Sequence, residues 1–227
     1  MKISIISLFP EVFSTYFDCS ILGRAQEKGF VEIEYIQLRD FGKGVHRSVD
    51  DRPFGGGKGQ LIQCEPVLKA IRCVQKEDSK IYLLAPSGCL FNQKKAHEMA
   101  SCSHIILVCG HYEGFDYRLE EYCDGVFSIG DYVLSGGELA AMVITDAIVR
   151  LLPGVISEGS TKEESFENGL LEYPQYTQPA IFEEKEVPEV LRSGNHAKID
   201  IYRKEQALLR TKKMRPDLYE AYQKKEN

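Results

Sequence analysis

A regular alternation of short apolar segments with segments of helical spacing constrains the fold of this chain more than any other feature. Short apolar runs predict buried β-strands, and apolar residues recurring every three or four positions predict amphipathic helices. Such alternation is typical of an α/β domain whose mainly parallel sheet is covered by helices. The predicted strands are Lys2–Leu8, Val31–Gln37, Lys80–Leu84, His104–Cys109 and Gly125–Ile129. The predicted helices are Ile21–Glu27, Cys64–Val74, Asn92–Met99, Glu138–Leu152, Asn195–Lys213 and Pro216–Lys225.

The alternation stops near Leu151–Val155 (LLPGV), where a proline and a glycine close the last long helix. The next residues, 156–168, are polar and acidic and contain glycine, serine and threonine, which is typical of a linker. We therefore predict three parts: an α/β domain at 1–155, a mobile linker at 156–168, and a small, mostly helical C-terminal domain at 169–227.

Charge is distributed unevenly along the chain. The formal net charge is −6, which by itself argues against a nucleic-acid partner. However, residues 192–227 carry ten Lys and Arg against five Asp and Glu, whereas residues 152–191 carry two against nine. A local basic patch governs phosphate contacts more than the total charge does. A solvated helix face explains the same charges equally well, so both interpretations stay open.

The cysteines and the hydropathy indicate a reducing compartment. The chain has 7 cysteines, an odd number, and none are spaced as C-x-x-C, which argues against a disulfide framework and a zinc site. No apolar run reaches the roughly 18 residues that a membrane span needs. The first residues lack the small-residue cleavage site of a signal peptide. We expect a cytoplasmic protein with no membrane partner.

Three glycine-bearing turns follow three of the predicted strands. They are Ala85–Gly88 (APSG), Cys109–Gly114 (CGHYEG) and Ile129–Glu138 (IGDYVLSGGE). Ligands of open α/β sheets bind beyond the carboxyl ends of the strands, so these turns are expected to line one crevice. Glycine lets a ligand approach bare backbone N–H and C=O groups, which can read the edge of a purine. Each turn alone is also compatible with an ordinary βα connection.

Two common nucleotide-binding motifs are absent. No G-x-G-x-x-G opens a helix after the first strand. The segment Gly55–Gly59 (GGGKG) resembles a phosphate loop, but Lys58 is followed by Gly59 rather than by Ser or Thr. Neither a classical dinucleotide domain nor a P-loop ATPase is supported.

The segment His46–Phe54 (HRSVDDRPF) mixes arginines with paired carboxylates. Arg47 and Arg52 are candidates for phosphate contacts. Asp50 and Asp51 can instead pair with those arginines and neutralise the loop. The sequence alone does not separate the two interpretations.

Four blocks of the chain together resemble the TrmD family, the bacterial tRNA (guanine-N1)-methyltransferases that act on position 37. The blocks are Val49–Gly59 (VDDRPFGGGKG), Leu107–Gly114 (LVCGHYEG), Ser128–Glu138 (SIGDYVLSGGE) and Arg192–His196 (RSGNH). The resemblance extends from Ile5–Pro10 (IISLFP) to the basic C-terminal helices, and the Ser128–Glu138 block is long and unusual.

The resemblance implies a SPOUT-class fold, in which a deep trefoil knot in the α/β domain binds S-adenosylmethionine. It also implies a homodimer with shared active sites and a C-terminal domain, here 169–227, that grips the tRNA. The tRNA contacts it implies are Arg47, Asp50, Arg52, Ser193, Asn195 and His196. The cofactor-binding residues it implies are Leu84, Pro86, Gly88, Gly110, Tyr112, Glu113, Gly114, Ile129, Gly130, Tyr132, Leu134, Gly136 and Gly137.

The chemistry requires a base and a cation. Guanine N1 carries a proton at neutral pH, and its loss places negative charge on O6, so a carboxylate near N1 and a donor near O6 are needed. The resemblance assigns the O6 contact to Arg150 and the general base to Glu164. Glu164 stands where the family has aspartate, and Glu163 next to it remains an alternative base. His111 replaces an arginine, Glu172 an aspartate and Gln178 an arginine that are common in the family.

Mg²⁺ is a further candidate cofactor, although the sequence contains no dedicated metal motif. Three other functions were considered: a SPOUT methyltransferase acting on another group, a tRNA-binding protein that has lost activity, and a nucleotide-hydrolysing enzyme. A SPOUT methyltransferase that acts on another group would give no reason for the Arg150 and Glu164 pair. The interpretation as an inactive binding protein rests only on the changed residue at the base position. A nucleotide-hydrolysing enzyme would need phosphate-binding motifs, which the sequence lacks.

Overall fold

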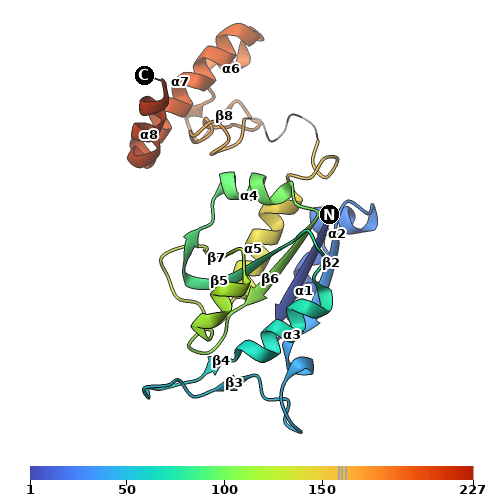
Figure 1. Cartoon of the computed structure of the whole chain (residues 1–227). Helices are drawn as coiled ribbons and strands as arrows, with labels where there is room; N and C mark the ends of the chain where they lie inside the picture. Colours follow the sequence, from blue (N-terminus) through green and yellow to red (C-terminus); the bar gives the residue numbers. More distant parts are fainter. Residues whose placement is uncertain (158, 160, 162, 227) are drawn as a thin grey trace. The chain divides into compact units, whose positions relative to one another are not determined.

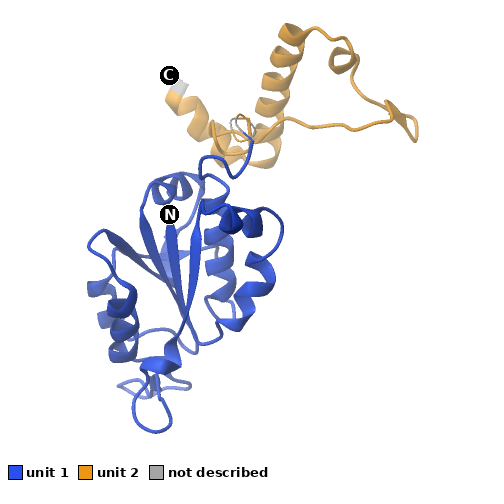
Figure 2. Ribbon diagram, turned by 90° about the vertical axis from the view of Figure 1, so that its right-hand side faces the viewer, with its two compact units in different colours: residues 1–158 blue, residues 159–227 orange. Residues whose placement is uncertain are grey.

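The computed structural model describes residues 1–157, 159, 161 and 163–226. It divides into two compact units, residues 1–158 and 159–227, which are coloured separately in Figure 2. The predicted linker at 156–168 includes residues 158, 160 and 162, which lie outside the described residues. Each unit is described by itself below.

The first unit contains a five-stranded parallel sheet with the order β2-β1-β6-β5-β7. Its strands are β1 (Lys2–Ser7), β2 (Glu32–Gln37), β5 (Ser79–Leu90), β6 (His104–Cys109) and β7 (Gly125–Ser128). Every described pair is parallel, which confirms the predicted α/β class with a mainly parallel sheet. Because all the strands point the same way, their carboxyl ends meet at one edge of the sheet.

Helices cover both faces of this sheet (Figure 1). One face carries α1 (Glu11–Phe17), α2 (Ser20–Glu27), α4 (Gln93–Ala100) and α5 (Glu138–Val149). The other face carries α3 (Cys64–Val74) and the short 3-10 helices η1 (Leu38–Phe41) and η2 (Tyr117–Tyr122). Strand β6 is buried along its whole length: Ile105 and Leu107 pack into the first core, and Ile106 and Val108 pack into the second. A continuous apolar run such as His104–Cys109 is therefore the mark of a strand covered on both sides.

Two predicted boundaries were wrong, and both errors follow from proline or glycine. Strand β5 does not end at Leu84 but continues to Leu90, with a register shift in which both Leu84 and Cys89 pair with Phe127 of β7. The turn signal of Ala85–Gly88 is therefore a detour within the strand. Helix α5 ends at Val149 rather than Leu152, because Pro153 disfavours helical backbone at the residue before it.

Two small ribbons lie outside the main sheet. Strands β3 (Asp50–Asp51) and β4 (Leu61–Ile62) pair antiparallel and frame the glycine-rich segment between them. In the second unit, β8 (Ile181–Phe182) pairs antiparallel with β9 (Lys185–Glu186).

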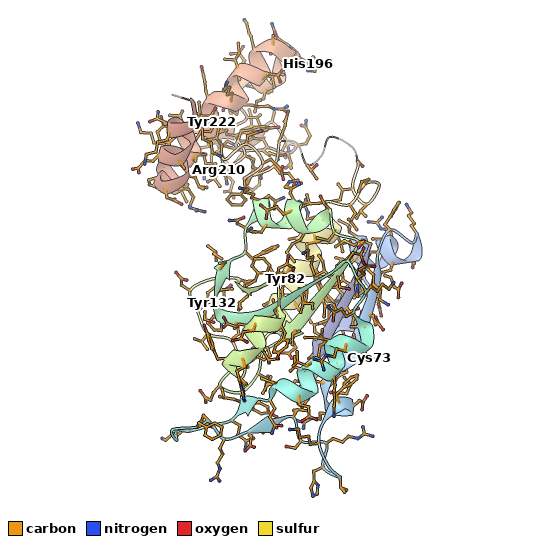
Figure 3. The ribbon with its side chains drawn as sticks, viewed as in Figure 1. Cys73, Tyr82, Tyr132, His196, Arg210 and Tyr222 are labelled. Carbon is orange, nitrogen blue, oxygen red and sulfur yellow. The ribbon has the colours of Figure 1, made fainter. Side chains whose placement is uncertain are left out.

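The rest of the second unit is mostly helical. It contains α6 (Glu189–Arg192), α7 (His196–Met214) and α8 (Pro216–Glu226). Figure 3 shows His196 and Arg210 on α7 and Tyr222 on α8. The two long helices match the predicted helices at Asn195–Lys213 and Pro216–Lys225 within about one residue at each end.

Candidate functional site

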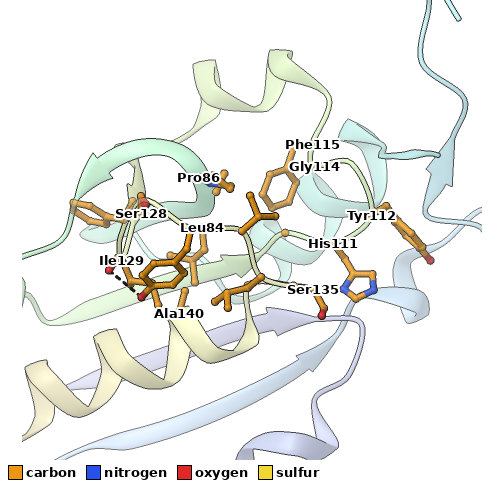
Figure 4. A pocket seen from close by; sticks show the side chains of 18 of the residues that line it. Leu84, Pro86, His111, Tyr112, Gly114, Phe115, Ser128, Ile129, Ser135 and Ala140 are labelled. Carbon is orange, nitrogen blue, oxygen red and sulfur yellow. Dashed lines mark hydrogen bonds between the residues drawn. The ribbon is translucent and has the colours of Figure 1, made fainter. Parts of the chain in front are cut away.

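A cavity lies beyond the carboxyl ends of β5, β6 and β7 (Figure 4). It encloses about 200 Å³, and about 780 Å³ when the space open to solvent is included. The enclosed volume is below the roughly 300–1,000 Å³ typical of small-molecule sites, and the cavity is open to solvent at its mouth. Its walls come from the detour within β5 and from the connections that follow β6 and β7, where the glycine-bearing turns predicted a crevice.

Twelve of the thirteen residues predicted to bind the cofactor line this cavity. They are Leu84, Pro86, Gly110, Tyr112, Glu113, Gly114, Ile129, Gly130, Tyr132, Leu134, Gly136 and Gly137. Gly88 is not among the lining residues. A side chain at Gly88 would come within 2.6 Å of the backbone of Val126 and Phe127, so this glycine serves the packing of the β5 detour against β7.

Sequence reasoning missed the apolar walls of the cavity. Phe115, Phe127, Val133 and Ala140 also line it, together with Ala85, His111, Ser128 and Ser135. The apolar members are ordinary core residues in type, so no motif marks them. Their positions directly beside the Cys109–Gly114 and Ser128–Glu138 blocks are the signal that would have found them.

The second and third connections are in direct contact. The Gly137 N–H donates to the Gly110 carbonyl at 2.7 Å, and His111 forms an antiparallel bridge with Gly136. A Cβ on Gly137 would lie 2.7 Å from the Gly110 nitrogen and 2.8 Å from the Cys109 Cα. Only glycine allows the two backbones to approach so closely.

Few polar side-chain atoms of the cavity are available for a ligand. The Tyr132 hydroxyl donates to the Ile129 carbonyl at 3.2 Å, the dashed line of Figure 4, and the Ser128 hydroxyl donates to the Gly130 carbonyl at 3.1 Å. By contrast, the buried Nδ1 atom of His111 has no hydrogen-bond partner among the described residues. The His111 ring is fixed by Phe9 and Tyr112, whose centroids lie 5.1 and 5.0 Å away. An apolar cavity with bare backbone and one unpaired imidazole nitrogen fits a flat, polar-edged ligand.

The glycine-rich segment is joined to the same site. The Glu113 N–H donates to the Gln60 carbonyl at 3.0 Å, and the Ile62 N–H donates to the Gly114 carbonyl at 2.9 Å. These bonds tie the segment between β3 and β4 to the loop after β6. The predicted tRNA-contact block is thereby placed next to the predicted cofactor loop.

The two arginines of the candidate tRNA block have different environments. Arg47 pairs with Asp40 at 2.6 Å, so its partner is neither Asp50 nor Asp51. The exposed guanidinium of Arg52 has no ion-pair partner among the described residues. The Asp50 backbone carbonyl accepts a bond from the Gln63 side chain at 3.0 Å, which anchors β3. Self-neutralisation of the loop by Asp50 and Asp51 is therefore not what the structure shows.

The two predicted catalytic residues lie in different units. Arg150 is the C-cap residue of α5, directly after the helix that forms one wall of the cofactor cavity. Glu164 lies in the second unit and lines a cavity of about 470 Å³ with Glu163, Tyr173 and Arg203. The structure therefore gives the surroundings of each residue but no distance between them.

The Arg192–His196 block runs from the end of α6 to the start of α7. The Asn195 side chain accepts the Lys198 N–H at 3.2 Å and caps the helix, and the Ser193 hydroxyl accepts the Asn195 N–H at 3.2 Å. His196 is exposed at the first position of the helix (Figure 3). Ser193 and Asn195 thus have a local structural role, which the resemblance did not reveal.

Neither a metal cluster nor a membrane helix is found in the described part of the chain. No group of three or more His, Cys, Asp or Glu side chains there is arranged to hold a metal ion, so we assign no step to Mg²⁺. No described helix is both long enough and apolar enough to cross a membrane.

Fold and site together define a class: an α/β protein whose glycine-rich loops enclose a cavity at the carboxyl edge of its sheet. Comparison with known proteins then identifies the family. A family model described as tRNA (Guanine-1)-methyltransferase TrmD matches residues 1–221. The chain belongs to this family, which confirms the resemblance seen in the sequence.

Individual relatives agree with the family assignment. The tRNA (guanine-N(1)-)-methyltransferase of Dictyoglomus turgidum is 53% identical over 97% of this chain and 90% of its own length. The enzyme of the same name from Carboxydothermus hydrogenoformans is 52% identical over 96% of this chain and 87% of its own. That of Mycoplasma pneumoniae is 49% identical over 98% of this chain and 96% of its own.

Proposed function

We propose that this chain transfers a methyl group from S-adenosylmethionine to N1 of guanine 37 in tRNA, next to the anticodon. The observation that carries the proposal is the cavity at the carboxyl edge of the sheet, lined by twelve of the residues that the family resemblance assigns to the cofactor. Membership of the TrmD family supports both the donor and the acceptor. A tRNA substrate also implies a cytoplasmic site of action.

The residues of the cavity fit S-adenosylmethionine. The adenine ring would lie between the apolar walls and be read by backbone groups of the loop that contains Ile129, Tyr132 and Leu134. The unpaired Nδ1 of His111 is a further hydrogen-bonding group at the wall. When bound there, S-adenosylmethionine supplies a methyl group that is already activated on a sulfonium.

The remaining chemical step is the activation of the guanine. Glu164 would accept the N1 proton as general base, and Arg150 would donate to O6, where the negative charge develops. These two residues belong to different units of the described structure. Arg47, Asp50, Arg52, Ser193, Asn195 and His196 would contact the tRNA, with 169–227 as the tRNA-binding domain.

A trefoil knot in the first unit is part of the proposal. The hydrogen bond between Gly137 and Gly110 supports it, because the chain after β7 passes directly beside the loop after β6. The contact is close enough that both crossing points need glycine. Threading of one loop through the other would account for such an approach.

A homodimer is also part of the proposal. Val12 and Tyr16 on α1 are exposed beside Leu139 and Val143 on α5, and the Tyr16 hydroxyl bonds to Asp146 at 2.5 Å across the two helices. Helix α5 is thus apolar toward the core and also toward solvent. A helix that is apolar on all sides is normally buried on all sides, which supports a partner subunit at this face.

The test measures methyl transfer from labelled S-adenosylmethionine to a tRNA transcript with guanine at positions 36 and 37, beside one with adenine at 37. We expect transfer to the guanine transcript alone. Glu164→Gln should lower the rate by at least about 100-fold, because general bases contribute roughly 10²–10⁴. Binding of S-adenosylmethionine by calorimetry should be unchanged, since its cavity lies in the other unit.

Glu163→Gln is the comparison variant: it removes the neighbouring carboxylate and should lower the rate far less than Glu164→Gln, because Glu163 would not take the N1 proton. Full activity of Glu164→Gln with loss in Glu163→Gln would move the base to Glu163. Failure of the wild-type protein to methylate either transcript while it still binds tRNA would favour an inactive binding protein.

A further inference from the structure

The segment that carries Glu164 docks on one stripe of helix α7. The stripe consists of Arg203, Ala207 and Thr211, which are spaced four residues apart and so lie on the same face of the helix. Ala207 and Thr211 are the buried residues of α7. We refer to residues 163–173 as the base segment.

Thr211 makes the central bond between the base segment and α7. Its hydroxyl accepts the Leu171 N–H at 2.9 Å and donates to the Ala207 carbonyl at 2.7 Å. The Thr211 side chain is fully buried, so both bonds are shielded from water. A buried hydroxyl with both functions satisfied holds its partner in one place.

Arg203 and Tyr173 hold the other end of the base segment. The guanidinium of Arg203 lies over the Tyr173 ring at 4.7 Å, a cation–π contact. The Tyr173 hydroxyl donates to Glu163 Oε2 at 2.9 Å, and Arg203 Nη1 lies 3.9 Å from the same oxygen. The carboxylate of Glu163 is therefore engaged within its own unit.

Two hydrogen bonds within the base segment close a turn directly after Glu164. The Phe166 N–H donates to the Leu170 carbonyl at 2.7 Å, and the Glu172 N–H donates to the Ser165 hydroxyl at 3.1 Å. Glu164 lies between the anchored Glu163 and this closed turn. Its backbone is thus fixed from both sides relative to α7.

We infer that Thr211 and Arg203 are positioning residues that keep the base segment on α7, with Glu163 as the anchor and Glu164 as the carboxylate that is presented. The inference rests on the proposed role of Glu164 as the base. The inference further means that the proposed base, Glu164, keeps a fixed position relative to α7, the helix that carries basic residues of the second unit. A tRNA bound on α7 would then meet Glu164 at a fixed place relative to that helix.

The first experiment compares Thr211→Val with Thr211→Ser in the full-length protein. Valine keeps the shape of threonine but removes the acceptor for the Leu171 N–H, whereas serine keeps the acceptor. We expect hydrogen exchange at the Leu171 amide to become about 10-fold faster in Thr211→Val. We expect kcat to fall by about 10- to 100-fold, because misplacement by about 1 Å can have that effect. KM for S-adenosylmethionine should not change, and Thr211→Ser should restore both values.

A second arm tests the anchor without altering the core. Tyr173→Phe removes the bond to Glu163, and Glu163→Gln removes the charge that faces Arg203. Each should speed exchange in residues 163–173 and lower kcat by about 3- to 10-fold, with the effects not additive because they break one network. Glu205→Gln, an exposed charge removal on the same helix, is the control and should change neither quantity.

The outcomes separate the inference from the proposed base. If Thr211→Val leaves exchange at Leu171 unchanged, or speeds exchange while kcat stays at the wild-type value, the positioning role is overturned. If Glu164→Gln remains active while exchange still responds to Thr211→Val, the base assignment fails but the docking of the segment stands. Should Thr211→Val not fold, Tyr173→Phe carries the same comparison.

Discussion

At the residue scale, the cavity depends on a position without a side chain and on a polar atom without a partner among the described residues. Gly137 lies against the backbone of Cys109 and Gly110, and no side chain fits between them. His111 presents a buried nitrogen without a protein partner to the same cavity. The position of Gly137 suits a close crossing of two loops, and that of His111 suits a ligand. Atoms added at either position should therefore weaken ligand binding before they have other effects.

We predict that Gly137→Ala weakens S-adenosylmethionine binding by at least about 10-fold. The added Cβ would lie 2.7 Å from a backbone nitrogen that cannot swing away, and overpacking of this kind costs about 1–3 kcal/mol. Isothermal calorimetry measures the affinity directly. Gly125→Ala is the control, because its Cβ would meet only the Tyr82 ring at 3.7 Å or more, an ordinary contact. Equal affinities in both variants would contradict the prediction.

The sequence identified most of the cavity but could not identify all of it. The glycine-bearing turns predicted a crevice at this edge of the sheet, and the family resemblance supplied the twelve residues that line it. Phe127 and Ala140 have the same residue types as the core, so only their position beside the blocks could have indicated them. Gly88 lies outside the lining and packs against β7, and close packing against a strand and close approach of a ligand both favour glycine.

At the element scale, β6 carries a polar relay in an otherwise apolar strand. The buried His104 ring is 2% exposed, with Nε2 2.9 Å from the Ser4 hydroxyl and Nδ1 2.7 Å from the Ser79 hydroxyl. Ser4 donates to Glu34 at 3.0 Å, so it accepts from Nε2; Ser79 accepts the Lys76 N–H at 2.7 Å, so it donates to Nδ1. With Nε2 as donor and Nδ1 as acceptor, both ring nitrogens of a neutral imidazole are satisfied. A second proton, on Nδ1, would have no acceptor.

The relay predicts how stability depends on pH. Burial, together with the charges of Lys2 and Lys76, lowers the pKa of His104 below its usual 6.5, although Glu34 and Asp78 oppose the shift. The unfolded chain then binds more protons than the folded one between the two pKa values. The relay therefore stabilises the fold fully above about pH 6.5 and progressively less as the pH falls toward the folded pKa.

Thermal unfolding of the wild type and of His104→Gln between pH 8 and pH 5 checks this prediction. The wild type should be more stable by about 1–3 kcal/mol at pH 8, since the variant leaves Ser4 or Ser79 without a partner. The difference should shrink as the pH is lowered. A difference that stays constant over this range would show that His104 does not titrate as the relay requires.

The predicted strands of the main sheet and the six predicted helices are present, but helix α1 and the short strands β3, β4, β8 and β9 were not predicted. Ala85–Gly88 contains the composition of a turn, yet β5 regains its pairing with β7 at Cys89. The cause lies in the partner strand β7, where Phe127 pairs with Leu84 before the detour and with Cys89 after it. The local sequence pattern of Ala85–Gly88 does not reveal this pairing, because Phe127 lies about 40 residues further along the chain.

At the scale of the whole molecule, the first unit exposes an apolar face that its own core does not explain. Leu139 and Val143 on α5 are 56% and 49% exposed, next to Val12 and Tyr16 on α1. This face lies on the side of the sheet opposite α3. The proposed homodimer would cover it.

We predict that Val143→Asp shifts the protein from dimer to monomer in sedimentation experiments. A buried, unpaired carboxylate at a subunit interface is strongly unfavourable, so the dissociation constant should rise by at least about 100-fold. Methylation should fall with it, since the active sites are shared in the proposal. Cys73→Asp, an exposed position on α3 (Figure 3), is the control and should leave the dimer intact. A wild-type protein that sediments as a monomer would refute the proposed assembly.

The strand order has a consequence for synthesis on the ribosome. Lys2 of β1 pairs with Glu32 on one side but with His104 on the other, so the second edge of the first strand stays open for about a hundred residues of translation. At about 5–20 residues per second, that interval is roughly 5–20 s. During that interval one edge of this apolar strand has no partner strand, so the nascent chain should be bound by chaperones that recognise apolar segments until β6 emerges.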